Sequence, residues 1–228
     1  MKILSIDSAT SACSVAVWAD GALRAIERAD LARGQAEALV PMIERVRRQA
    51  NLTFAELDRL AVTVGPGHFT GLRSGLAAAR GLALATGLPL IGITTLDAVA
   101  AGVPAAEREG AVLVVALDSK RQEAYVQAYA SDLTPLSGPQ AKRPAEYAAE
   151  LARGSGSRFV TVGDASAEIA LVLEQNRVSV IRSSAAPRPD AAIVAALAAK
   201  APAPSVPPAP LYIHPVETTS PRKRVAPG

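Results

Sequence analysis

The residues of this chain that could do chemistry are few and lie far apart. Its 228 residues include two histidines, His68 and His214, and one cysteine, Cys13. A zinc or iron site usually needs clustered ligands, such as two histidines one helical turn apart, and the sequence has no such pair. A catalytic triad would depend on His68, and no G-x-S-x-G elbow occurs. We therefore expect no metal, no cofactor and no catalytic residue, and an independent peptidase is the weakest alternative.

Two acids, Asp7 and Asp118, each follow an apolar segment that predicts a β-strand. A strand that ends in an acid and a small-residue turn can bind phosphate where glycines let the backbone approach, as in actin-like and hexokinase-like ATPases. Here the turns at 8–10 and 119–121 contain no glycine, and only Gly163-Asp164 offers one later. Two interpretations stay open. Asp7 caps a turn, or Asp7 and Asp118 flank Mg²⁺-ATP in a kinase or ATPase.

The most distinctive stretch, which we call the signature loop, runs from Gly65 to Arg73 and reads G-P-G-H-F-T-G-L-R. It separates a predicted strand from a predicted helix, and it is not a P-loop because no Gly-Lys-Ser/Thr follows. Thr70 is expected to cap the helix by accepting a backbone hydrogen bond. The residues that define the loop are Gly65, Pro66, Gly67, Phe69 and Thr70.

One face of the helix after this loop carries small residues. Gly71, Gly75 and Ala79 recur at four-residue spacing, which lets another helix approach closely, and Leu72 and Leu76 flank them. A glycine inside a helix costs about 1 kcal/mol relative to alanine, so two of them need an explanation. The groove packs either on another helix of the same chain or on a partner.

The elements that must position these residues alternate between strands and helices. The first half predicts, in order, three strands within residues 3–28, a helix at 35–49, a strand at 60–64, a helix at 70–86, a strand at 90–93 and a helix at 96–101. The second half predicts strands at 112–118 and 124–130, a helix at 144–153, a strand at 159–162 and a helix at 165–175.

The two halves resemble each other. Sliding the sequence by 111 positions places Asp7 over Asp118 and Trp18 over Tyr129 within the same strand-turn-strand pattern, which indicates a duplication. We predict an α/β fold with lobes at 1–104 and 105–198 and a proline-rich tail at 199–228. The tail holds eight of the seventeen prolines and should run extended. Its apolar triplet 211–213 is expected to dock on the body, and its basic triplet 222–224 to be a solvated end.

Composition and charge exclude several classes of protein. Half of the residues are hydrophobic and 20% are charged, which is typical of a globular chain. No apolar run approaches the roughly 20 residues that span a bilayer, and Asp7 interrupts the segment that a signal peptide would need. With one cysteine, these features favour a cytoplasmic protein without membrane contact. The net charge of +3 permits contact with RNA but does not argue for it.

The chain resembles a known family, the bacterial TsaB (YeaZ) proteins, which are subunits of the machinery that makes threonylcarbamoyladenosine in tRNA. The signature loop is similar to that family's signature, with His68 where serine is common. Further similar stretches are 6–16, Leu39-Val40-Pro41-Met42-Ile43, Thr94-Thr95-Leu96, 118–125 and Pro210-Leu211-Tyr212-Ile213.

This resemblance implies an actin-like, RNase H-like duplicated two-lobe fold of the ASKHA superfamily. It implies a non-catalytic subunit that pairs with and activates the metal-binding homologue TsaD, with the ATPase TsaE acting through the complex. Contact with tRNA would be indirect or weak, and the chain alone could form a homodimer. The implied interface uses the first two helices of the N-terminal lobe. Its residues would be Leu39, Met42, Ile43, Val46, Gly71, Leu72, Arg73, Gly75, Leu76 and Ala79.

Overall fold

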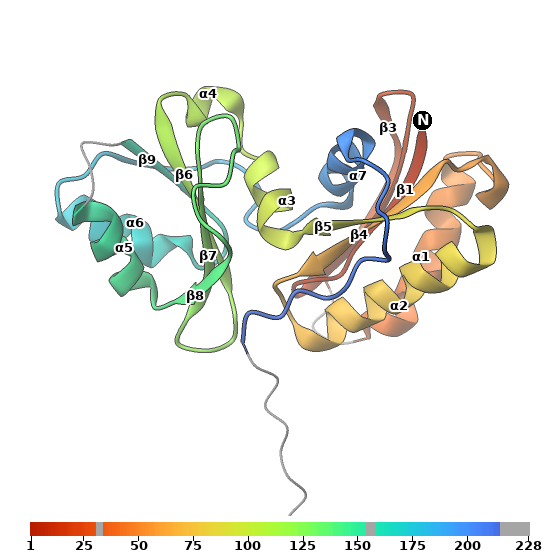
Figure 1. Cartoon of the computed structure of the whole chain (residues 1–228), viewed down its shortest axis with the longest axis horizontal. Coiled ribbons are helices and arrows are strands. Elements are labelled where there is room, and N and C mark those ends of the chain that lie inside the picture. The colour runs from red at the N-terminus through yellow and green to blue at the C-terminus, as the bar shows by residue number, and fades with distance from the viewer. Residues whose placement is uncertain (31–33, 154–157, 215–228) are drawn as a thin grey trace, which may run out of the picture.

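The computed structural model describes residues 1–30, 34–153 and 158–214, which form two α/β lobes side by side (Figure 1). The basic triplet 222–224 lies outside the described residues. The elements of the first half are β1 (Lys2–Asp7), β2 (Ala12–Ala19), β3 (Ala22–Asp30), α1 (Gln35–Gln49), the 3₁₀ turn η1 (Phe54–Glu56), β4 (Arg59–Gly65), α2 (Phe69–Thr86), β5 (Leu90–Thr94) and α3 (Thr95–Ala101). Those of the second are α4 (Ala105–Arg108), β6 (Ala111–Asp118), β7 (Ala124–Tyr129), β8 (Gln140–Lys142), α5 (Pro144–Arg153), β9 (Arg158–Val162), α6 (Ser166–Gln175), β10 (Val180–Arg182) and α7 (Ala191–Lys200).

The two sheets have the same topology. The first has the strand order β3-β2-β1-β4-β5, and the second, read in the same direction, has β8-β7-β6-β9-β10. In the first sheet β1 is antiparallel to β2 and parallel to β4. In the second sheet β6 is likewise antiparallel to β7 and parallel to β9. This repeated order confirms the duplicated two-lobe α/β fold expected from the sequence.

The fixed offset of 111 holds for β1 and β6 but not for the strands that follow. Asp7 pairs with Ser14 across the six residues 8–13, whereas Asp118 pairs with Ala124 across only the five residues 119–123. The second turn is therefore one residue shorter. The structural counterpart of Trp18, which pairs with Ile3, is Ala128 and not Tyr129.

Helices cover both faces of the first sheet (Figure 1). The two long helices α1 and α2 lie together on one face, against β2 and β4, and α7 lies on the other, against β1 and β2. The α7 start is fixed by Ser5 and Ser14, since Ser5 Oγ donates to the Ala191 carbonyl at 2.6 Å and the Ala191 N–H donates to Ser14 Oγ at 3.0 Å. We propose to count α7 with the first lobe, although all but its last two residues lie within the range 105–198 assigned to the second.

Helix α3 joins the two lobes. Its residues Leu96, Val99 and Ala100 belong to the core of the second sheet, with Leu113 and Val115, while the helix also contacts β4, β5 and α7 of the first lobe. Each lobe therefore receives on its sheet the helix that follows the other lobe's last strand.

Candidate functional site

The signature loop is shaped by two other segments that press against its backbone. Gly65 has a φ of +110°, and a Cβ there would lie 2.6 Å from the Leu211 carbonyl oxygen. A Cβ on Gly67 would lie 2.2 Å from the Ala9 carbonyl oxygen, which accepts the His68 N–H at 2.7 Å. Side chains at 65 and 67 would thus collide with backbone. The glycines serve internal packing at these two positions.

The helix after the loop does not use the predicted cap. It begins at Phe69, its N-cap residue is His68, and no side chain bonds the free N–H groups there. Thr70 lies inside the first turn, where its carbonyl accepts the Ser74 hydroxyl at 3.0 Å. The predicted end at Gly87 is confirmed, with φ +71° and its N–H bonded to Ala83 at 2.9 Å.

Asp7 is 1% exposed and lies in the core at the end of β1. Its Oδ1 accepts the Thr63 hydroxyl at 2.8 Å and the Ala9 N–H at 3.2 Å, and its buried Oδ2 has no hydrogen-bond partner in the described part of the chain. Burial raises the pKa of Asp7 to about 7, and the bonds from Thr63 and Ala9 offset only part of that rise. This geometry agrees with the interpretation of Asp7 as a turn cap.

The equivalent turn in the second lobe is held by its own lysine. Asp118 accepts the Lys120 N–H at 2.7 Å and is bonded by Lys120 Nζ, and its own N–H donates to Asp164 at 2.8 Å. Burial raises the pKa of Asp118, but the bonds from Lys120 outweigh this and leave it below its usual value. A Cβ on Gly163 would lie 2.0 Å from the Ala116 carbonyl oxygen, so this glycine too is needed for internal packing.

His68 faces this second turn from the first lobe. Burial lowers the pKa of His68 and the charge of Lys120 lowers it further, while Asp118 and Asp164 raise it. The structure therefore brings the signature loop to the turn after β6. Among the described residues, no group of three or more His, Cys, Asp or Glu side chains could hold a metal ion. None of the described helices is long and apolar enough to cross a membrane.

Most residues of the implied partner face are buried inside this chain. A Cβ on Gly75 would lie 2.2 Å from Ser8 Oγ, and Ser8 donates to the Gly71 carbonyl at 2.9 Å, so the small-residue groove of α2 packs on the turn after β1. Arg73 is exposed but engages Tyr212 of the same chain. The remaining implied residues are buried in the core of the first lobe, and they are Leu39, Met42, Ile43, Val46, Leu72, Leu76 and Ala79. The groove therefore packs inside the chain, but on the turn after β1 and not on another helix as the internal alternative expected.

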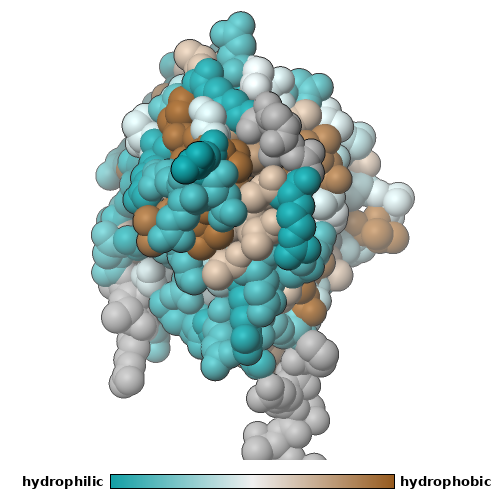
Figure 2. All heavy atoms as spheres, turned by 90° about the vertical axis from the view of Figure 1, so that its left-hand side faces the viewer, coloured by the Kyte–Doolittle hydropathy of each residue, from teal (hydrophilic) through white to brown (hydrophobic). Residues whose placement is uncertain are grey.

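The exposed side of α1 and α2 carries large apolar side chains and a groove. Val40 on α1 is 59% exposed and Leu84 on α2 is 88% exposed. Between the helices lies a groove of about 260 Å³, and on Gly81 a Cβ would meet nothing within 4 Å. The groove is lined by Val40, Ile43, Glu44, Phe54, Ala78, Gly81 and Leu82. We call this groove with the exposed residues Ala77, Leu84 and Ala85 the outer face. By contrast, the second-lobe end of the molecule is mainly hydrophilic, interrupted by hydrophobic patches (Figure 2).

Sequence reasoning missed the outer face because small residues surround most of α2. Ala77, Ala78, Gly81 and Ala85 repeat at three- and four-residue spacing just as Gly71, Gly75 and Ala79 do. Leu84, with no packing partner implied by the pattern, was the signal that could have identified the exposed side.

Comparison with known proteins identifies the family. The family model described as TsaD, tRNA N6-adenosine threonylcarbamoyltransferase, matches residues 29–201. The chain belongs to this family. It is 40% identical over 134 residues to the tRNA threonylcarbamoyladenosine biosynthesis protein TsaB of Escherichia coli, covering 58% of this chain and 56% of that protein. It is 36% identical over 127 residues to TsaB of Haemophilus influenzae, covering 55% and 52%. The matched region thus spans about half the length of these curated relatives.

Solved structures agree on the fold. A Pseudomonas aeruginosa protein described as similar to the peptidase YeaZ has a TM-score of 0.75 at 22% identity, covering 93% of this chain and 99% of that one. YeaZ from Pseudomonas aeruginosa has a TM-score of 0.69 at 22% identity, covering 87% and 90%. The resemblance to TsaB (YeaZ) proteins and the two-lobe α/β fold are confirmed.

Proposed function

We propose that this chain is a non-catalytic subunit that binds and activates a TsaD-type catalytic subunit, which forms threonylcarbamoyladenosine next to the tRNA anticodon. Membership of the family and relatives named for threonylcarbamoyladenosine biosynthesis support the pathway. The observation that carries the partner role is the outer face, where Leu84 and Val40 leave large apolar side chains in solvent and a mainly apolar groove lies between α1 and α2. Such a surface is typical of a protein interface.

We place the interface on the outer face, which shares only Ile43 with the residues implied by the resemblance. The equivalent helices of a TsaD-type partner would pack on α1 and α2 to form a four-helix contact, with Gly81 and Ala77 allowing close approach. Arg48, which is exposed and pairs with Glu44 of the groove, would lie at the rim. Without this partner, two copies of the chain could use the same face to form a homodimer.

The non-catalytic role is supported by how the two acid-bearing turns are closed. The loop backbone at Gly67 and His68 lies directly against Ala9 and covers the turn after β1. Asp7 is buried, and Asp118 is bonded by Lys120. In this proposal a TsaE-type ATPase acts through the complex, contact with tRNA is indirect or weak, and the chain works in the cytoplasm without a membrane.

Isothermal titration of the isolated chain with Mg²⁺-ATP is expected to give no heat beyond dilution up to millimolar nucleotide, because neither acid is free to hold the metal. Lys120→Ala, which releases Asp118, should not restore binding, since the turn after β1 stays covered. Saturable binding by the wild-type chain would favour the alternative of a kinase or ATPase that acts alone.

A further inference from the structure

Residues 201–214, which we call the strap, follow α7 and belong to no helix or strand. Figure 1 shows the strap descending along the first lobe past β5 and α2 and ending between the two lobes. Its course is fixed by specific contacts at several points, so it is more than a loose end of the chain.

The first set of contacts holds the strap to the first lobe. Arg80 Nη2 on α2 donates to the Pro208 carbonyl at 2.7 Å, and the Leu211 N–H donates to the Val64 carbonyl at the end of β4 at 2.7 Å. Two glycines on the neighbouring strands β4 and β5 make room for it. A Cβ on Gly65 would lie 2.6 Å from the Leu211 oxygen, and a Cβ on Gly92 would lie 2.7 Å from Pro208 Cβ. The sheet edge is thus shaped to accept this segment.

Tyr212 is held by the signature loop and the first turns of α2. The Arg73 guanidinium carbon lies 3.5 Å from the centre of the Phe69 ring, and Arg73 Nε donates to Tyr212 Oη at 3.1 Å. The Phe69 and Tyr212 rings are 5.7 Å apart. Arginine over an aromatic face contributes on the order of 0.5–1 kcal/mol at an exposed site. The contact of Tyr212 with Arg73 and Phe69 is therefore stabilising but weak enough to open reversibly.

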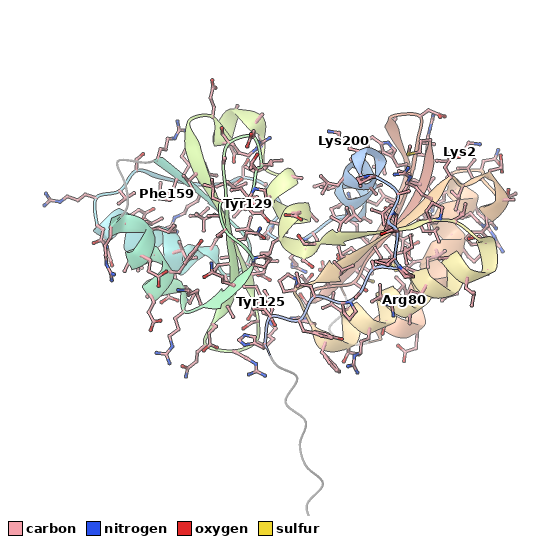
Figure 3. All side chains as sticks on the ribbon, viewed as in Figure 1. Lys2, Arg80, Tyr125, Tyr129, Phe159 and Lys200 are labelled. Atoms are coloured by element: carbon pink, nitrogen blue, oxygen red, sulfur yellow. The ribbon has the colours of Figure 1, made fainter. Side chains whose placement is uncertain are left out.

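The last two residues of the strap reach the second lobe. Ile213 packs against the core cluster of the second sheet, and the His214 ring lies 5.6 Å from the ring of Tyr125 on β7. Figure 3 labels Arg80 on one lobe and Tyr125 on the other, with the strap running between them. Four consecutive residues, 211–214, therefore contact both lobes.

We propose that the strap is a latch that fixes the opening between the lobes, and that the signature loop with α2 is its receptor. The receptor takes an extended segment in which a tyrosine stands between two aliphatic residues, and its occupant is this chain's own Leu211-Tyr212-Ile213. The lobes are joined elsewhere by α3, which packs on both sheets, and by the chain that leads from β10 of the second lobe to α7 on the first. The strap adds a non-covalent fastening to these two connections and sets the angle between the lobes. Because the latch rests on few buried contacts, it opens without unfolding either lobe.

Hydrogen exchange of the full chain tests the receptor. In Tyr212→Ala and Arg73→Ala, the Leu211 amide, which is protected by Val64, is expected to exchange at least tenfold faster than in the wild type, while the His68 amide, bonded to Ala9, keeps its rate. Tyr212→Phe, which loses only the hydroxyl, should have a smaller effect. Arg48→Ala is the control, since that side chain is 76% exposed on α1. An unchanged Leu211 amide in Tyr212→Ala would overturn the receptor.

An inter-lobe distance measurement tests the latch. Spin labels on Gln49→Cys in α1 and Glu168→Cys in α6 span the lobes, and the buried Cys13 stays unlabelled. Tyr212→Ala is expected to broaden and shift the distance distribution, and Arg48→Ala to leave it unchanged. If Tyr212→Ala speeds exchange of the Leu211 amide but leaves the inter-lobe distance distribution as in the wild type, the strap does not set the angle between the lobes, and the proposal is overturned. Light scattering that revealed a dimer with exchanged straps would also contradict it, because the occupant would then be a second copy.

Discussion

Gly75→Leu is expected to lower the free energy of unfolding by about 3 kcal/mol, because a larger side chain must enter a filled core beneath α2. A single Cβ at this position would lie 2.2 Å from Ser8 Oγ and 3.8 Å from Ile6 Cγ2. Ser8 cannot turn aside without losing its 2.9 Å bond to the Gly71 carbonyl, which would leave buried polar groups unpaired. Urea denaturation followed by circular dichroism measures the loss.

Gly81→Leu is the matched control, since it makes the same change on the opposite side of the same helix. A Cβ at Gly81 meets nothing within 4 Å, and replacing an exposed helical glycine gains about 1 kcal/mol of helix propensity at most. We expect unchanged or slightly higher stability. Equal losses in the two variants would contradict the orientation of α2, on which the reassignment of the interface depends.

In the wild-type chain the free energy of unfolding is expected to fall as the pH rises, and Asp7→Asn is expected to remove this fall. The pKa of Asp7 is raised from 3.8 to about 7 by burial, so between these values the unfolded chain releases a proton that the folded chain keeps. The free energy of unfolding therefore falls with rising pH, and the loss is complete above about pH 7. From this group alone, the fall between pH 5 and 8 is on the order of 2–3 kcal/mol.

The asparagine amide keeps the oxygen that accepts from Thr63 and Ala9, and it cannot ionise. Urea titrations measure the free energy of unfolding at pH 5 and at pH 8. The difference between Asp7→Asn and the wild type should shift by about 2–3 kcal/mol in favour of the variant from pH 5 to pH 8. Asp20→Asn, at a carboxylate that is 63% exposed, is the control and should show no such gain. A parallel pH dependence for wild type and Asp7→Asn would mean that Asp7 is ionised in the folded chain, as a metal-binding acid would be.

The sequence was sufficient for most of the longer elements and for the duplication, because periodicity and turn residues are local signals. It did not predict η1, α4, β8, β10 or α7. The hairpin at Asp20-Gly21, where both residues have positive φ, and the helix end at Gly87 follow from backbone preferences that need no neighbours. The docking of the triplet 211–213 is also confirmed, by the bond from Leu211 to Val64. An apolar segment in a proline-rich tail can leave water only by packing on the body of the protein.

The orientation of α2 could not be predicted, for a physical reason. Glycine and alanine are compatible with both a buried and an exposed helix face, so a helix rich in them carries little contrast between its sides. The conflict was settled by Ser8, which lies 67 positions before Gly75 along the chain and touches it only in the folded state. The role of the loop glycines was hidden in the same way, because Ala9 and Leu211 are distant in sequence. A family signature shows that residues matter without showing what they touch.

The most direct test of whether the outer face of α1 and α2 binds a TsaD-type subunit is the mass of the complex. We would co-express this chain with the TsaD-type subunit of the same organism and measure the mass by size exclusion with light scattering. Wild type and Gly138→Arg, an identical change at an open and exposed glycine of the second lobe, should give a one-to-one complex. Gly81→Arg should remain folded and should bind the TsaD-type subunit with at least tenfold lower affinity. A Gly81→Arg chain that still binds as the wild type does would contradict the claim.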